Sequence, residues 1–503
     1  MPGLFATWFG AGTLLTATDE VAHGGLQLIA LEPLGSGLCL IIAGVAFAQK
    51  LWDMKLLTVI DFYRLRFGPR AEVVSGVLMV PGYLGWIAAQ FIALSELLHL
   101  FFGIPVAVGI AAVAVVGALY TLIGGMWSVT LTDAIQVTIL VLGIFVLAVS
   151  VLWTLGEGNP ASGAATLWAN IPAEKRTIVP TAHAGEAVGW ITLLAVAALG
   201  NIPAQDLTQR IFASKSATVA KRACITAGVL YVLVGLIPVL LGLGLLPLLD
   251  TRDGSVLAAV ASAFLHPLPL ILFILAICSA VLSTIDSAML SPSSVIAQNI
   301  VPHLWRSQSN TTNRLALNRW MVLVVTGFSL VLAYSGASAF ELLETAYAIG
   351  LVALLVPLAG GLYSKAGDER TALWSMGVAT VVWGTHLALG MEDFLGLTPV
   401  LPATLASTLI GLAIYTVGAR ISKSESSINI IIRCCCCFLL SHYSPSFGPS
   451  GGSTHIFHRR ISRRRRNPNL GGTNLLRHLT IHIFPGIVMV GGVTTFRRPL
   501  YNV

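Results

Sequence analysis

Charged residues are scarce in this chain. Asp, Glu, Lys and Arg make up 10% of its 503 residues, hydrophobic residues make up 56%, and the mean hydropathy is +0.84. Soluble domains carry about 25% charged residues, so the composition excludes that class and predicts an all-α polytopic membrane protein. Apolar runs of about 20 residues predict about twelve transmembrane helices, at 3–30, 34–49, 71–98, 102–121, 130–155, 186–203, 220–247, 268–300, 314–336, 339–363, 372–391 and 398–419.

Clusters of metal-binding or catalytic side chains are lacking as well. Histidines and cysteines of the apolar region lie far apart along the chain, among them His23, His99, His183, His266, Cys39, Cys224 and Cys278. A zinc site or redox pair needs closer spacing, and a membrane enzyme would need a nucleophile, base or metal constellation. The sequence therefore does not predict an enzyme, and the three cysteines read as small buried residues.

Basic residues alternate between the loops of the predicted helices. Fourteen lie after the even-numbered spans and three in the intervening loops. The fourteen are Lys50, Lys55, Arg64, Arg66, Arg70, Arg210, Lys215, Lys221, Arg222, Arg306, Arg314, Arg319, Lys365 and Arg370. Cytoplasmic loops are rich in Lys and Arg, so the pattern predicts a multi-pass protein of the plasma or inner membrane with both termini in the cytoplasm. The net charge of +7 reflects this topology and a basic tail. We therefore expect membrane lipid as a partner and draw no inference of nucleic-acid binding from the charge. No obligate protein partner is evident in the sequence.

The two ends depart from the rest of the chain. Met1 stands only a few residues before a dense Gly/Thr motif, with no room for a preceding helix, which suggests a truncated or misassigned start. We expect one transmembrane domain at 1–422 and a separate tail at 423–503. The tail contains four consecutive cysteines, Cys434 to Cys437, and Glu425 as its one acid. It reads either as a disordered basic tail or as an aberrant C-terminus.

One apolar segment, 278–294, contains six serines, Thr284 and Asp286. A carboxylate at membrane depth costs several kcal/mol unless a cation, a partner or a water-filled cavity meets it. Hydroxyl groups three and four residues apart on a helix point to one side, and clustered oxygens suit a small hard cation. The alternative is that each hydroxyl bonds to the carbonyl four residues earlier or packs between helices. The whole cluster favours an ion site.

Two predicted helices are interrupted at corresponding places. The first contains Gly10 and Gly12, and the sixth ends in Gly200 and Pro203. Paired interruptions five helices apart indicate a five-plus-five inverted repeat with broken first and sixth helices, whose freed carbonyls can bind a cation. Each glycine or proline alone would indicate only packing or a kink.

Four blocks of the sequence resemble the sodium:solute symporter family. They are Ala6–Thr13, Gly124–Gln136, Pro203–Arg210 and Ser279–Ser294, in the family's order, and the resemblance covers about residues 3 to 420. It implies a sodium ion as the transported coupling ion and a small-molecule solute as the partner. By position it implies sodium ligands at Ala6, Phe9, Ala280, Ser283 and Thr284. Asp133 and Asp286 match acids that hold a second cation or line its exit; a helix-capping role for Asp133 is equally open.

The sequence is most similar to the choline-transporter-like branch of that family, which suggests a cationic substrate held by aromatic faces. Trp8 matches one such position, whereas Ser36, Ala89 and Ala204 stand where that branch has aromatic residues. The expected substrate-binding residues are Trp8, Gly10, Gly12, Trp86, Gln90 and Tyr347. For Trp86 a packing role, and for Gln90 a bond to a neighbouring helix, are the alternatives.

These observations predict sodium-coupled symport of a small polar organic solute by alternating access. A channel would need a filter motif or charge ring, and none is evident. The remaining alternative is a sodium-dependent membrane sensor or inactive homologue without uptake.

Overall fold

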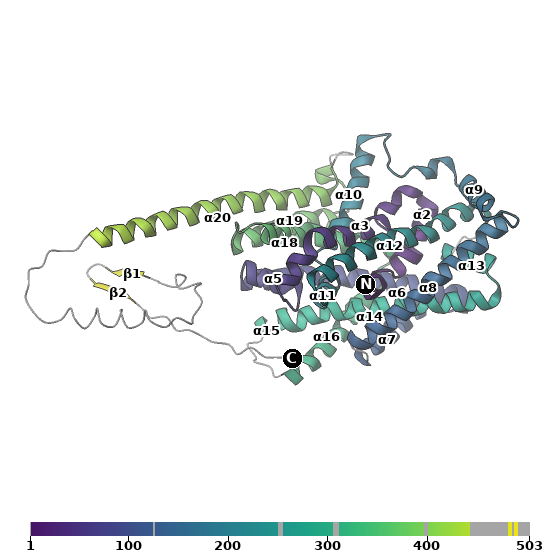
Figure 1. Cartoon of the computed structure of the whole chain (residues 1–503), viewed down its shortest axis with the longest axis horizontal. Helices are drawn as coiled ribbons and strands as arrows, with labels where there is room; N and C mark the ends of the chain where they lie inside the picture. Colours follow the sequence, from purple (N-terminus) through teal and green to yellow (C-terminus); the bar gives the residue numbers. More distant parts are fainter. Residues whose placement is uncertain are drawn as a thin grey trace, which may run out of the picture. The chain divides into compact units, whose positions relative to one another are not determined.

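The computed structural model describes residues 2–123, 126–249, 255–304, 311–396, 401–442, 481–484 and 487–490, and these residues are almost entirely helical (Figure 1). The α-helices are α1 (Pro2–Trp8), α2 (Ala17–Gly24), α3 (Leu34–Ile42), α4 (Ala48–Asp53), α5 (Val59–Arg66), α6 (Pro69–Phe102), α7 (Val106–Ile123), α8 (Met126–Leu155), α9 (Pro160–Asn170), α10 (Ala184–Gly200), α11 (Gln205–Phe212), α12 (Ala217–Leu245), α13 (Val256–Phe264), α14 (Pro267–Val295), α15 (Val301–Leu304), α16 (Thr311–Ala333), α17 (Ala339–Ile349), α18 (Val356–Tyr363), α19 (Glu369–Ala388) and α20 (Ala403–His442).

Short turns of other helix types join several of these. The π-helical turns are η1 (Gly12–Thr16), η3 (Ala43–Phe47), η6 (Ile296–Ile300) and η7 (Gly350–Leu355), and the 3-10 turns are η2 (Leu26–Ala30), η4 (Ala173–Arg176), η5 (Leu246–Leu248) and η8 (Phe394–Gly396). The two strands, β1 (Ile481–Phe484) and β2 (Ile487–Val490), pair antiparallel with Ile481 opposite Val490.

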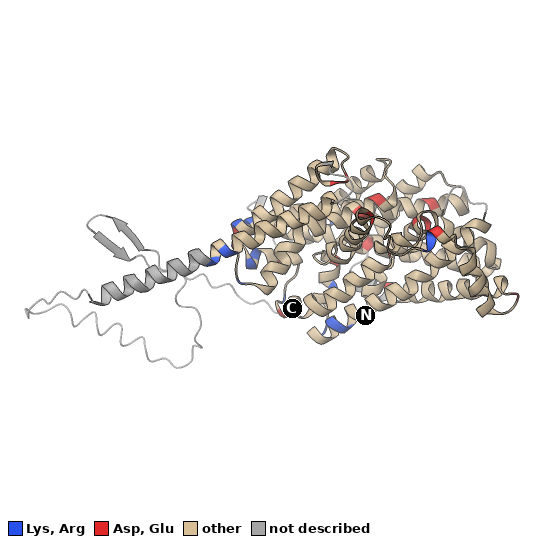
Figure 2. Ribbon diagram, turned by 90° about the horizontal axis from the view of Figure 1, so that it is seen from above, with Lys and Arg blue, Asp and Glu red and all other residues tan. Residues whose placement is uncertain are grey.

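The chain forms two compact units, Met1–Ile430 and Ile431–Val503. The first unit contains the long apolar helices. In Figure 2 most of its ribbon is neither acidic nor basic, as its composition requires. Most of the predicted tail at 423–503 lies outside the described residues, which there comprise the end of α20 and the two strands.

Nine helices among the described residues are long and apolar enough to cross a membrane, and a tenth span results if α10 and α11 count as one bent helix. The long helices follow the predicted spans closely; α6 and α12, for example, cover 71–98 and 220–247 within a few residues. The predicted spans 3–30 and 372–391 are helical but are not among the nine, the first because it is divided into short helices. The count of about twelve stays a prediction.

The first apolar segment is interrupted at Phe9 and Gly10. The amide of Gly10 donates to the carbonyl of Trp8 (2.9 Å) in place of that of Ala6. The amide of Ala11 donates to Oε1 of Gln90 on α6 (3.0 Å). The carbonyls of Ala6 and Thr7 therefore lose the partners that a continuous α-helix would give them.

The second interruption separates α10 from α11, which are bent by 41° relative to each other. Pro203 lies in this break and has no amide hydrogen to donate. The break also brings two backbones close together, because a Cβ atom on Gly200 would lie 2.2 Å from the carbonyl oxygen of Tyr347. The residue at position 200 must therefore be glycine for α10 to pack against α17.

Gly200→Ala is expected to destabilise the protein by about 1–3 kcal/mol, because neither backbone can move away from the added methyl group. Thermal unfolding of the purified protein in detergent measures the effect. Gly189→Ala on the same helix is the matched control, since a Cβ atom there meets nothing within 4 Å. Equal unfolding temperatures for the two variants would contradict the close approach at Gly200.

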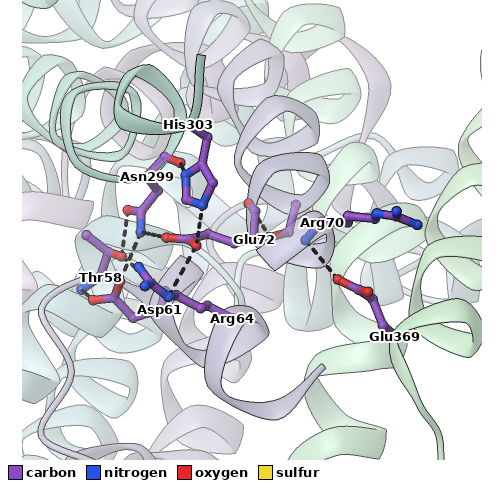
Figure 3. A network of polar contacts seen from close by, with 9 residues as sticks. Thr58, Asp61, Arg64, Arg70, Glu72, Asn299, His303 and Glu369 are labelled. Carbon is purple, nitrogen blue, oxygen red and sulfur yellow. Dashed lines mark hydrogen bonds and ion pairs between the residues drawn. The ribbon is translucent and has the colours of Figure 1, made fainter. Parts of the chain in front are cut away.

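A polar network fixes α5 against the ends of α6 and η6 (Figure 3). Helix α5 begins with a capping box in which Thr58 and Asp61 bond each other's backbone. Asn299 donates to Asp61 (2.9 Å) and to the buried Glu72 (2.9 Å). Oε2 of Glu72 lies 3.6 Å from Arg64 and 3.3 Å from His303. This network holds the connection between the second and third predicted spans in place.

Candidate functional site

A cavity lies where the two helix interruptions meet. Its empty volume is about 580 Å³, including the space open to solvent. Helices α1, α6, α11, α12 and α17 contribute the side chains that decide its chemistry: Trp8, Tyr83, Trp86, Asp206, Tyr231 and Tyr347. Five of these six are aromatic. The cavity therefore offers ring faces together with one carboxylate.

Asp206, in the first turn of α11, is 4% exposed. Nε1 of Trp8 donates to its Oδ2 (2.7 Å), and the hydroxyl of Tyr83 donates to its Oδ1 (2.5 Å). The backbone amide of Asp206 donates in turn to the Tyr83 hydroxyl (3.0 Å). Among the described residues, no Lys, Arg or His nitrogen lies within 4.0 Å of this carboxylate. The side-chain hydrogen bonds that this carboxylate accepts at the cavity wall therefore come from the neutral donors Trp8 and Tyr83, and Arg210, one turn later on α11, acts on it electrostatically.

A second buried carboxylate, Glu32, lies behind the same wall and is 2% exposed. Its Oε1 accepts from Ser36 (2.6 Å) and Tyr347 (3.1 Å). Its Oε2 accepts from Thr13 (2.9 Å) and Tyr231 (2.9 Å). Two of these four donors, Tyr231 and Tyr347, also line the cavity.

The residues expected to bind sodium are distributed over two neighbouring places. Thr284 on α14 lies beside the interruption of the first segment, because a Cβ atom on Gly10 would be 2.8 Å from its hydroxyl oxygen. The same hydroxyl lies 3.1 Å from the carbonyl oxygen of Ala280. Ala6 and Phe9 are buried in the interrupted segment, which packs against α14. The hydroxyl of Thr284 therefore lies where the interrupted first segment packs against α14.

Ser283, one residue earlier, points toward α8 and donates to Oδ1 of the buried Asp133. Oδ2 of Asp133 lies 3.5 Å from Arg210. Nη2 of Arg210 also donates to Thr7 (2.7 Å) and Ser287 (2.9 Å). Both carboxylate oxygens of Asp286 are buried, and neither has a hydrogen-bond partner among the described residues. An unpartnered buried carboxylate is the group most in need of a cation.

Three of the six expected substrate residues, Trp8, Trp86 and Tyr347, line the cavity. Gly10 and Gly12 instead allow α6, α14 and α17 to approach the interrupted segment. Gln90 accepts from the Ala11 amide, as expected for a bond to a neighbouring helix. Gly124 and Gly125, and the side chains of 126–132, lie outside the described residues. No group of three His, Cys, Asp or Glu that could hold a metal ion occurs in the described part of the chain.

Sequence reasoning missed Asp206, Glu32, Tyr83 and Tyr231. The signal for the two acids was present, because each is a carboxylate close to an apolar segment, the criterion that selected Asp286. The two tyrosines stand in long apolar helices and carried no signal beyond their residue type.

Comparisons with known proteins agree with this architecture. A family model described as the sodium:solute symporter family matches residues 3–378. The chain is 26% identical over 414 residues to the high affinity choline transporter 1 of Homo sapiens, covering 79% of this chain and 69% of that protein. It is 24% identical over 445 residues to the sodium/pantothenate symporter of Escherichia coli K12, covering 85% of this chain and 89% of that protein.

Two solved structures show the same fold. A Na⁺-coupled sialic acid symporter in a substrate-bound, outward-open state superposes with a TM-score of 0.64 at 20% identity, covering 84% of this chain and 88% of that chain. Mhp1, a nucleobase-cation-symport-1 family transporter, superposes with a TM-score of 0.54 at 15% identity, covering 84% of this chain and 92% of that chain. Together with the family model's match to most of the apolar region, these findings show that the chain belongs to the sodium:solute symporter family.

Proposed function

We propose that this sodium-coupled symporter carries a small organic cation, which binds in the aromatic cavity with its charge toward Asp206. The observation that carries the proposal is a buried carboxylate set among aromatic rings. Ring faces attract ammonium groups by about 0.5–2 kcal/mol each, and an anion held by neutral donors keeps its charge available. The similarity to choline transporters supports the same class of solute.

Sodium is assigned to the carbonyls of Ala6, Phe9 and Ala280 and the hydroxyls of Ser283 and Thr284. The support for this assignment is that the interruption of the first segment lies against Thr284. Hard oxygen ligands from two elements suit a small cation. We assign Asp133 and Asp286 to a second cation site or to the exit path of the first, because the carboxylate of Asp286 has no partner of its own among the described residues.

The transport cycle follows from placing both sites at the interruptions. Sodium moving down its gradient gains about 2.3 kcal/mol per 100 mV of membrane potential, and this energy drives the solute against its own gradient. Movement of the two halves of the five-plus-five inverted repeat against each other would give one outward-open and one inward-open arrangement of the same sites. Residues 1–422 form the transport domain, with both termini in the cytoplasm, as the alternation of basic loops indicates.

Uptake into proteoliposomes tests the proposal. The solutes are choline as a quaternary cation, betaine and proline as zwitterions, and pantothenate as an anion, each with and without an inward sodium gradient. We expect sodium-driven accumulation of choline and none of pantothenate, because Asp206 repels an anion. Accumulation of pantothenate in preference to choline would refute the cationic class, and sodium binding without any uptake would favour a sensor.

A further inference from the structure

Glu32 is a buried carboxylate that neither the sodium assignment nor the solute assignment uses. Its four hydrogen-bond partners are hydroxyl groups from η1, α3, α12 and α17, namely Thr13, Ser36, Tyr231 and Tyr347. No Lys, Arg or His nitrogen of the described residues lies within 4.0 Å of it. Hydroxyl groups differ from ammonium or amide donors because they can also accept a hydrogen bond.

In the ionised form Ser36 and Tyr347 donate to Oε1 of Glu32 and Tyr231 donates to Oε2, while the Thr13 hydroxyl, which contacts both Oε2 and the Tyr231 hydroxyl, donates to one of these two oxygens. The protonated form is satisfied as well, because the Tyr231 hydroxyl has a second acceptor, the carbonyl oxygen of Trp8, at 3.0 Å. When the Tyr231 hydroxyl donates to the Trp8 carbonyl, the Tyr231 oxygen is free to accept the hydrogen bond that protonated Oε2 of Glu32 donates. Both protonation states therefore keep their hydrogen bonds without movement of the backbone.

The spacing of these oxygens favours a proton over a metal cation at this place. Oε2 of Glu32 lies 2.9 Å from both Thr13 and Tyr231, and Tyr231 lies 3.0 Å from the Trp8 carbonyl. These are hydrogen-bond distances. A hard cation with metal–oxygen distances of about 2.3–2.6 Å holds neighbouring ligand oxygens about 3.3–3.7 Å apart, so an ion would have to push this cluster open.

The cavity gives a proton access to Glu32. Tyr231 and Tyr347 line the cavity and bond to the two different oxygens of the carboxylate. A tyrosine hydroxyl can take a proton from a hydronium ion in the cavity and pass its own proton to Glu32, which leaves a water molecule, a neutral tyrosine and an uncharged carboxyl group. The titratable side chains facing Glu32 are Tyr231 on α12, Tyr347 on α17 and Cys39 on α3.

We propose that Glu32 is a proton-binding site of this transporter and that its proton opposes binding of the organic cation in the adjacent cavity. The second half rests on the proposed function. With Glu32 ionised, two carboxylates, Glu32 and Asp206, attract a cation in the cavity. Protonation of Glu32 removes one of these two negative charges. At an effective dielectric constant of about 20 and a separation of about 10 Å, the loss of one unit charge weakens cation binding about tenfold.

Infrared spectroscopy of the purified full chain, titrated between about pH 4 and pH 9, tests the proton site directly. We expect the carbonyl band of a protonated carboxyl to grow as the pH falls. The part of this band that belongs to Glu32 is expected to be missing in Glu32→Gln and to be kept in Glu174→Gln, the matched control at an exposed position. Identical titrations of the wild type and Glu32→Gln would overturn the proposal.

Tyr347→Phe provides a second variant that keeps its ring in the wall. The carbonyl oxygen of protonated Glu32, Oε1, then loses one of its two donors. We expect its band to move to higher frequency, and an unchanged frequency would also overturn the assignment, even if Glu32→Gln failed to fold.

Choline binding to the same proteins tests the coupling to the solute. In the wild type, affinity is expected to fall about tenfold as Glu32 takes up its proton, whereas Glu32→Gln binds weakly at every pH. The same pH dependence in both proteins would refute the coupling. A titrating Glu32 band in a protein that binds no choline would leave the proton site standing and would refute the organic cation.

Discussion

Asp206→Asn is expected to weaken choline binding by about 2–5 kcal/mol, or about 30- to 5,000-fold, the usual result of removing one partner of a buried charge pair. The fold should survive, because asparagine has nearly the same shape. Its amide oxygen can accept from Trp8, and its amide nitrogen can donate to the Tyr83 hydroxyl, which is also able to accept. The loss therefore reports the charge together with the acceptor that the Tyr83 hydroxyl loses. Isothermal titration of the purified protein in saturating sodium measures it.

Two controls separate charge from shape. Asp53→Asn makes the same substitution at an exposed carboxylate and should bind choline like the wild type. The uncharged carbon isostere of choline should bind the wild type and Asp206→Asn equally weakly, because it cannot use the carboxylate. Undiminished choline affinity in Asp206→Asn would show that Asp206 does not recognise the solute. A loss of affinity for the isostere as well would indicate a changed cavity.

The long helices could be predicted from sequence because a membrane requires about 20 apolar residues for each crossing. Helices α6 and α12 therefore lie close to the predicted spans. The interruptions were also predictable, since Gly10, Gly200 and Pro203 weaken a helix wherever they stand. The bend of 41° between α10 and α11 was not, because it depends on the packing of Gly200 against Tyr347.

The functional site likewise contains some residues that could be predicted from the sequence and others that could not. The approach of Thr284 to Gly10 was expected from family resemblance, not from spacing, because these residues stand on separate helices far apart in the chain. Asp206 and Glu32 were not predicted at all. Asp206 bonds to Tyr83 and Glu32 to Tyr347, partners 123 and 315 residues away. No local pattern records such contacts, and only the cost of burying a carboxylate marked these residues in advance.

The sodium assignment predicts that Ser283→Ala combined with Thr284→Ala raises the sodium concentration for half-maximal uptake by at least about 100-fold. Each hydroxyl oxygen that contacts an ion is worth about 1.5–3 kcal/mol, and the double variant removes two of them. Ser283→Ala also deprives Asp133 of its donor. Uptake of choline into proteoliposomes at increasing sodium concentration measures the change, with solute affinity at saturating sodium as the internal reference.

The alternative explanation for these hydroxyls is that they bond only to protein groups, Thr284 to the carbonyl of Ala280 on its own helix and Ser283 to Asp133 on α8. Ser293→Ala combined with Ser294→Ala is the matched control on α14, because those hydroxyls donate to the carbonyls of Met289 and Leu290, at 2.7 Å each. It removes the same number of hydroxyl groups, each bonded four residues back, away from the interruption at Gly10. A large rise in the sodium requirement for the first variant alone would assign Ser283 and Thr284 to the ion. Equal, small changes in both would assign the two hydroxyls to these protein hydrogen bonds. Asp286, whose buried carboxylate has no hydrogen-bond partner among the described residues, would then be the next group to test as the sodium ligand.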